Sequence, residues 1–183
     1  MTAALKKALP KIPMSTSAIL IGSVAPDIPL YLLSIGGIFY YEKLLGWTKH
    51  ATFHHMFHDL FFHDPYWIIC HNTLHAPLVL IAGLIFIRVL KGKEKFQTNW
   101  FTWFFAACLL HSVVDIFTHH DDGPLLFFPF NWHYRFISPV SYWDSKHYGF
   151  QFSIFEIIFD IALLCYLVIP FMIHRIKLRS TKV

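Results

Sequence analysis

The chain has 183 residues, of which 56% are hydrophobic, 19% are aromatic and only 14% are charged. Because a soluble domain carries about 25% charged residues, this composition excludes an ordinary soluble globule and a disordered chain. The net charge of +4, without aromatic residues interleaved in basic runs, also excludes a nucleic-acid-binding module.

Four apolar segments are long enough to be membrane spans, since about 20 helical residues cross the hydrocarbon core of a bilayer. The first is interrupted by Pro26, Asp27 and Pro29, and two prolines around a carboxylate break or kink a helix. Irregular backbone is tolerated at membrane depth only where protein buries it or it lines a cavity. The interruption therefore indicates a site around Asp27. The four segments cover residues 15–40, 66–88, 100–119 and 152–173.

The connection after the first span is rich in histidine. His50, His54 and His58 recur every four residues and share one helical face, while apolar residues largely fill another. This pattern predicts an amphipathic helix that lies in the membrane interface and ends at Asp64 and Pro65. The alternative is that these histidines line an entry path or complete a metal site.

The second, third and fourth spans each carry ionisable residues, which are costly inside a membrane and mark functional sites by default. Each span places a pair of them four residues apart, which puts both members on one helical face. These residues are His71 and His75, His111 and Asp115 with His119 one turn further, and Glu156 and Asp160.

A long aromatic connection separates the third and fourth spans. It begins with a polar turn that contains Asp122 and continues with eight aromatic residues between Phe127 and Trp143. We expect this loop to fold back as a lid over the site. Arg135 is then among the few basic groups that can meet an anionic substrate, so Asp122 and Arg135 are candidate catalytic residues.

The basic residues predict how the spans are oriented. Eleven of the 15 Lys and Arg residues lie in the N-terminal segment, in the connection 88–95 and in the C-terminal tail. Such residues are enriched on the cytoplasmic side. We therefore predict an inner or cell membrane protein with both termini in the cytoplasm and the connections 41–65 and 120–151 outside. A cleaved signal peptide at the start is the rival interpretation, but no small-x-small cleavage site precedes Pro26.

With this orientation, the ionisable residues of all four spans fall at one depth in the outer leaflet. Without a cation, their carboxylates would repel one another and be forced to protonate. Mixed imidazole and carboxylate ligation without thiolate suits zinc, with iron or manganese as alternatives, and the three cysteines lie singly in apolar stretches. One or two ions are expected, although Asp160 serves equally well as a bridge between helices. The candidate metal ligands are Asp27, His71, His75, His111, Asp115, His119, Glu156 and Asp160.

These elements together predict an all-α polytopic membrane protein. We expect residues 1–183 to form a single membrane-embedded domain. Its architecture is a four-helix transmembrane bundle with an interfacial amphipathic helix and an outer aromatic loop.

Three motifs in the first 130 residues carry a likeness to a known family. They are Gly22-Ser23-Val24-Ala25-Pro26-Asp27, then His71-x3-His75, then His111-x3-Asp115 followed by Thr118-His119 and by Gly123 to Phe130. This combination resembles the bacterial YdjM-like family of inner-membrane, metal-dependent hydrolases. The resemblance implies a hydrolytic reaction and a metal site that includes Asp27, both histidines of the second span, His111 and Asp115. The His-x3-Asp step is also similar, more weakly, to the all-helical zinc-dependent phospholipase C and nuclease fold.

The expected function is hydrolysis of an amphipathic or lipid phosphoester or ester near the outer leaflet. A bound metal would lower the pKa of a water, Glu156 would take its proton, and a second ion or Arg135 would stabilise the developing charge. One alternative is a di-iron membrane oxygenase of the desaturase or hydroxylase type, which also uses four spans and His-x3-His boxes. Another is a metal transporter or a metal-binding protein without catalytic activity.

Overall fold

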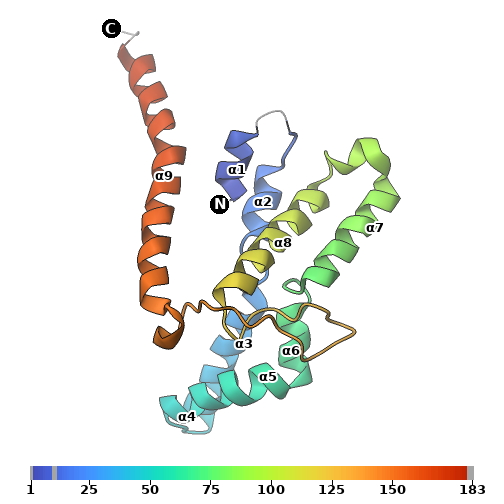
Figure 1. Ribbon diagram of the computed structural model, residues 1–183, viewed down its shortest axis with the longest axis vertical. Helices are drawn as coiled ribbons and strands as arrows, with labels where there is room; N and C mark the ends of the chain where they lie inside the picture. Colours follow the sequence, from blue (N-terminus) through green and yellow to red (C-terminus); the bar gives the residue numbers. More distant parts are fainter. Residues whose placement is uncertain (1, 10–11, 181–183) are drawn as a thin grey trace.

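The computed structural model describes residues 2–9 and 12–180, and it contains no strand within them. The all-α fold class is therefore confirmed for this part of the chain (Figure 1). Two basic residues used to predict the orientation, Lys11 and Lys182, lie outside it. In chain order the elements are α1 (Thr2–Ala8), α2 (Thr16–Gly22), α3 (Ile28–Ile38), the π-helical η1 (Phe39–Leu44), α4 (Lys49–His54), the π-helical η2 (His55–Leu60), α5 (Phe61–His63), α6 (Pro65–Asn72), α7 (Pro77–Phe96), α8 (Trp100–Thr118), the 3₁₀-helical η3 (Ser145–His147) and α9 (Gly149–Ser180).

Two helices in the described part of the chain are each long and apolar enough to cross a membrane. They are α8 and the Gly149–Ile169 portion of α9. Helices α6 and α7 meet the same measure together, as a pair bent by 48°. The structure therefore supports two or three spans by length and composition, compared with the four that the sequence predicts.

The first predicted span, residues 15–40, divides as its prolines indicate. Helix α2 begins at the N-cap Ser15, whose hydroxyl accepts from the amide of Ala18, and it ends in a turn that leads to Asp27. Helix α3 then starts with Pro29 in its first turn, a position where the missing amide proton costs nothing. Asp27 consequently lies at the break between two helices.

The histidine-rich connection is helical from Lys49 to His63 through α4, η2 and α5, as predicted. His50, His54 and His58 are exposed along it, and the centroids of the last two rings are 4.6 Å apart. Met56 and Phe61 are buried and pack with Trp67 of α6. The two-faced character of this helix is therefore confirmed, and one of its faces covers α6.

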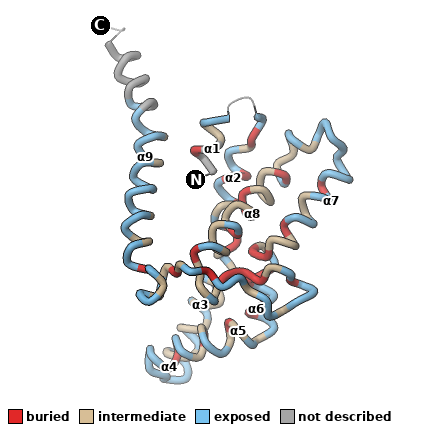
Figure 2. Tube along the Cα trace, in the orientation of Figure 1, coloured by how far each residue is buried: buried red, intermediate tan, exposed pale blue. Residues whose placement is uncertain are grey.

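Helix α9 stands apart from the other long helices (Figure 1). The portion of α9 that is long enough to span a membrane has no buried residue, and Figure 2 shows the helix largely exposed. Just past its middle, Lys7 of α1 donates to the carbonyl of Tyr166 and lies over the Tyr166 ring. Near its start, η3 packs against it.

Helix α8 is the centre of the bundle, because both α2 and α7 pack against it. The contact with α2 is made possible by Gly22. A Cβ at this position would lie 2.4 Å from the carbonyl oxygen of Phe104 and 3.0 Å from the Cβ of Ala107. The backbone of α2 is therefore held against α8 just before the turn that carries Asp27.

The variant Gly22→Ala is expected to destabilise the protein by about 1–3 kcal/mol, the usual cost of overpacking a filled contact. Gly36→Ala is the matched control, because a Cβ on Gly36 meets nothing within 4 Å. At that helical position alanine should stabilise by about 0.5–1 kcal/mol. Thermal unfolding of both variants in the same detergent measures the difference, and equal melting temperatures would show that α2 does not pack closely on α8.

Candidate metal centre

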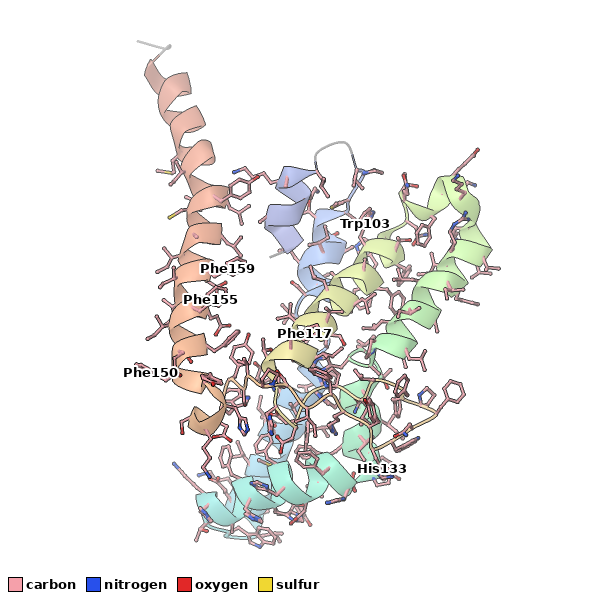
Figure 3. All side chains as sticks on the ribbon, in the orientation of Figure 1. Trp103, Phe117, His133, Phe150, Phe155 and Phe159 are labelled. Atoms are coloured by element: carbon pink, nitrogen blue, oxygen red, sulfur yellow. The ribbon has the colours of Figure 1, made fainter. Side chains whose placement is uncertain are left out.

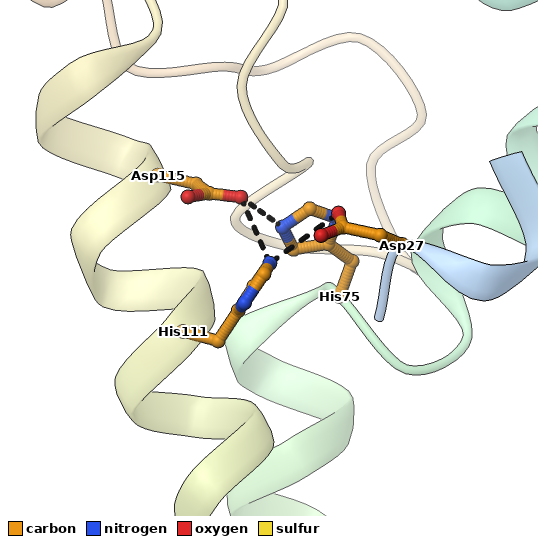
Figure 4. A group of neighbouring side chains, drawn as sticks. All are labelled: Asp27, His75, His111 and Asp115. Atoms are coloured by element: carbon orange, nitrogen blue, oxygen red, sulfur yellow. Dashed lines mark hydrogen bonds and ion pairs between the residues drawn. The ribbon is translucent and has the colours of Figure 1, made fainter. Parts of the chain in front are cut away.

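Four side chains from three parts of the fold converge beside α8 (Figure 4). Asp27 comes from the break before α3, His75 from the turn between α6 and α7, and His111 and Asp115 from successive turns of α8. Each offers one ligand atom, and these atoms all lie within 4.8 Å of one another. The structure thus brings together residues from three of the four predicted spans, which is the convergence that their shared depth predicts.

The orientation of His111 is fixed by the backbone of the broken span. Its Nδ1 lies 3.0 Å from the carbonyl oxygen of Ser23. Because a carbonyl only accepts, this nitrogen carries the proton and donates it. Nε2 then faces Asp27 Oδ1 at 3.4 Å and Asp115 Oδ2 at 3.2 Å. A carbonyl bond at one ring nitrogen, which directs the other at the ligand position, is the usual arrangement for a metal-binding histidine.

His75 shares the same carboxylate oxygen. Its Nε2 lies 2.8 Å from Asp115 Oδ2, and the side chain is buried. The turn that carries it is held by Ser112 of α8, whose hydroxyl donates to the His75 carbonyl at 2.5 Å. Asp115 therefore bridges two imidazoles that come from different helical segments.

Asn72 fixes the other side of this turn. Its fully buried amide donates to the carbonyl of Ile68 at 2.9 Å and accepts from the amide of Leu125 at 2.9 Å. The α6–α7 turn is thereby tied to the loop that follows α8. The sequence analysis did not single out Asn72 or Ser112, although each is a polar residue inside an apolar span and next to a candidate ligand.

His71 lies directly beside the four-residue group but does not belong to it. It is buried, and its ring centroid is 4.7 Å from that of His75. Neither of its ring nitrogens has a hydrogen-bond partner among the described residues. His71 and His75 are close, as their spacing predicts, even though α6 ends between them.

The donor set suits a bound cation. His75 Nδ1 and His111 Nε2 are buried nitrogens without a hydrogen-bond partner in the described part of the chain. A buried polar atom left unpaired costs about 1–3 kcal/mol. For His111, a cation at Nε2 removes this cost and at the same time offsets the charges of Asp27 and Asp115. The group is therefore a possible metal-binding site, composed of two imidazoles and two carboxylates.

Glu156 and Asp160 face this group from α9 without joining it. They line a cavity of about 690 Å³ whose opposite wall includes His111 and Asp115. Tyr142 also lines it, and burial together with the nearby Glu156 raises the pKa of this phenol to about 12. The two acids of the fourth predicted span thus lie across a space from the metal group, because α9 stands apart from α8.

His119 and Asp122 form a pair of their own at the end of α8. Nδ1 of His119 lies 3.0 Å from Asp122 Oδ1. Burial disfavours the charged form of His119, but the hydrogen bond with Asp122 and the nearby carboxylates outweigh it and raise its pKa above the usual range. Neither residue is part of the four-residue group.

Arg135 connects the aromatic loop to the histidine-rich helix. Its guanidinium donates to the carbonyl of Gly123 at 2.8 Å and lies about 5.0 and 5.1 Å from the ring centroids of Phe61 and Phe62. Burial lowers its pKa to about 10, so it is charged at neutral pH. It makes no ion pair with a carboxylate among the described residues.

No family model, no curated protein and no solved structure matches this chain.

Proposed function

We propose that the protein is a membrane-embedded, metal-dependent hydrolase that acts on an ester or phosphoester of an amphipathic or lipid molecule. The observation that carries this proposal is the convergence of Asp27, His75, His111 and Asp115 in one group. Two members of the group, His111 and Asp115, also line a largely apolar cavity. A donor set of two imidazoles and two carboxylates without thiolate suits zinc. It suits a di-iron oxygenase less well, because the iron ions of such an enzyme have a nearly all-histidine shell.

In this proposal the four converging residues hold the first ion. His71 beside His75, His119 at the end of α8 and Asp160 on the facing helix are available for a second ion. A bound zinc ion supplies an acidified water and an electrophile for the scissile group.

The remaining roles fall to side chains of this chain. Glu156 faces His111 and Asp115 across the cavity and accepts the proton of the attacking water. Arg135, which is charged and lacks a carboxylate partner among the described residues, stabilises negative charge on an anionic substrate. Asp122 orients His119 through their hydrogen bond.

We also propose that α2 with α3 forms the fourth membrane crossing, and that both termini lie in the cytoplasm. Support comes from the basic segments, because α1, the α7–α8 connection and the end of α9 gather at one end of the molecule (Figure 1). Since lysine and arginine favour the cytoplasmic side, the metal group then lies toward the outer face.

The test is a metal count combined with hydrolysis on the purified full chain in lipid nanodiscs. We expect zinc to co-purify, and we expect cleavage of 4-nitrophenyl phosphate or of a 4-nitrophenyl ester to stop on chelation and to return when zinc is restored. Bound iron with near-ultraviolet absorption would overturn the proposal in favour of an oxygenase. Weakly held, readily exchanged metal without hydrolysis would favour a transporter.

A further inference from the structure

The cavity between α8 and α9 has a polar part and an apolar part. Its polar part contains His111 and Asp115 of α8, Glu156 and Asp160 of α9, and Tyr142 of the aromatic loop. Its apolar part is lined by Ala107, Leu110 and Leu163, and large aromatic side chains line the cavity along its length. Phe117 of α8 and Phe155 and Phe159 of α9, labelled in Figure 3, are three of these.

The order of these residues along the helices separates the two parts in space. Helices α8 and α9 run in opposite directions, so the end of α8 is level with the start of α9 (Figure 1). Ala107 lies two helical turns before Asp115, or about 12 Å along the axis at about 1.5 Å per residue. Leu163 lies about two turns after Glu156 on the facing helix by the same measure. The cavity therefore runs from the aromatic loop, which contributes Tyr142, past His111 and Asp115 and on along the bundle.

The side of the cavity formed by α9 borders the membrane. Apart from the contacts near its start and around Tyr166, α9 leaves its apolar length largely exposed, and no residue of its membrane-length portion is buried. A hydrocarbon chain that leaves the bilayer between α8 and α9 meets the apolar side chains of Ala107, Leu110 and Leu163, and it loses no contact with water by doing so. A polar molecule arriving by the same route would have to leave water.

We propose that this cavity holds a single hydrocarbon chain of an amphipathic substrate, which enters sideways from the membrane between α8 and α9. The chain lies against Ala107, Leu110 and Leu163, and the polar head reaches His111 and Asp115. The cavity's continuity with the metal group favours this occupant over a second copy of the protein, because a packed helix there would cover His111 and Asp115. This inference rests on the proposed function only for the identity of the head group.

The test is photolabelling of the full chain in nanodiscs with hexadecyl phosphate that carries a diazirine on its alkyl chain. We expect the label on peptides of α8 and α9, with competition by unmodified hexadecyl phosphate and none by butyl phosphate. Leu163→Trp fills the apolar part and should reduce labelling at least tenfold. Leu164→Trp is the matched control, because Leu164 is exposed and does not line the cavity, and it should label like the native protein.

Zinc content is measured in both variants, since neither residue belongs to the metal group and the content should stay that of the native protein. Equal labelling of the two tryptophan variants, or equal competition by butyl phosphate, would overturn the inference. The inference would also be overturned if α8 and α9 carried no label and light scattering gave the mass of a dimer. A second copy of the protein would then fill the cavity. Labelling as expected in a protein that hydrolyses nothing would overturn the proposed function alone.

Discussion

Alanine at His111 or at Asp115 should leave the protein inserted in the membrane but without tightly bound metal. His111→Ala removes the buried Nε2 that faces two carboxylates. Asp115→Ala removes the one oxygen that lies near both His75 and His111. Loss of a residue that only hydrogen-bonds to a metal ligand costs about 10- to 100-fold in metal affinity. Loss of the ligand itself should cost at least as much, and elemental analysis of the purified variants measures it.

His133→Ala is the matched control for this experiment. His133 is an exposed histidine of the aromatic loop between α8 and α9 and contributes no ligand atom to the four-residue group (Figure 3). It should retain the metal content of the native protein. Full metal content in both site variants would exclude this group as the metal site. The contacts of His111 with Asp27 and Asp115, and of His75 with Asp115, would then be ion pairs of protonated imidazoles that need no metal.

The core of the candidate site could be predicted because helical spacing is a local property. His111 and Asp115 are four residues apart on an unbroken helix, so their proximity follows from the sequence alone. Asp27 could be placed at a break because Pro26 and Pro29 flank it. In both cases the residues that determine the geometry lie within one or two turns of the ligand.

Other parts of the site depend on contacts between distant segments. The carbonyl of Ser23, which fixes the ring of His111, has no side-chain signal, because every residue carries a carbonyl. His75 lies in a turn rather than on the helix that its spacing with His71 suggests. Ser112 of α8 holds that turn directly, and the amide of Leu125 holds it through Asn72. Only the packing of the helices against one another reveals these roles.

The position of the fourth predicted span was the least accessible to sequence reasoning. Depth arguments predict that Glu156 and Asp160 lie level with the metal group, and both residues line the cavity that His111 and Asp115 also line. Depth does not specify the distance between two helices, however. Small residues such as Gly22 bring α2 against α8, whereas the face of α9 toward α8 carries Phe155 and Phe159. Bulky aromatic side chains on this face keep the two helices apart and leave the cavity between them.

This separation favours a proton acceptor over a metal ligand as the proposed role of Glu156, and Glu156→Gln distinguishes the two roles. Glutamine has nearly the same size and still hydrogen-bonds, but it cannot accept a proton. If Glu156 takes the proton of the attacking water, turnover should fall by about 10²- to 10⁴-fold, the usual contribution of a general base. The zinc content should stay that of the native protein.

The measurements are the rate of hydrolysis as a function of pH and the metal content of the same sample. Loss of a general base removes the acidic limb of the pH profile, because that limb reports the protonation of the base. Glu94→Gln is the control, since Glu94 is exposed on α7 and outside the cavity, and it should leave both quantities unchanged. Loss of zinc in Glu156→Gln would instead mean that α9 approaches α8 far enough for Glu156 to bind the metal. Native rates with native zinc would remove Glu156 from the reaction, and the base would then have to lie on the α8 side of the cavity.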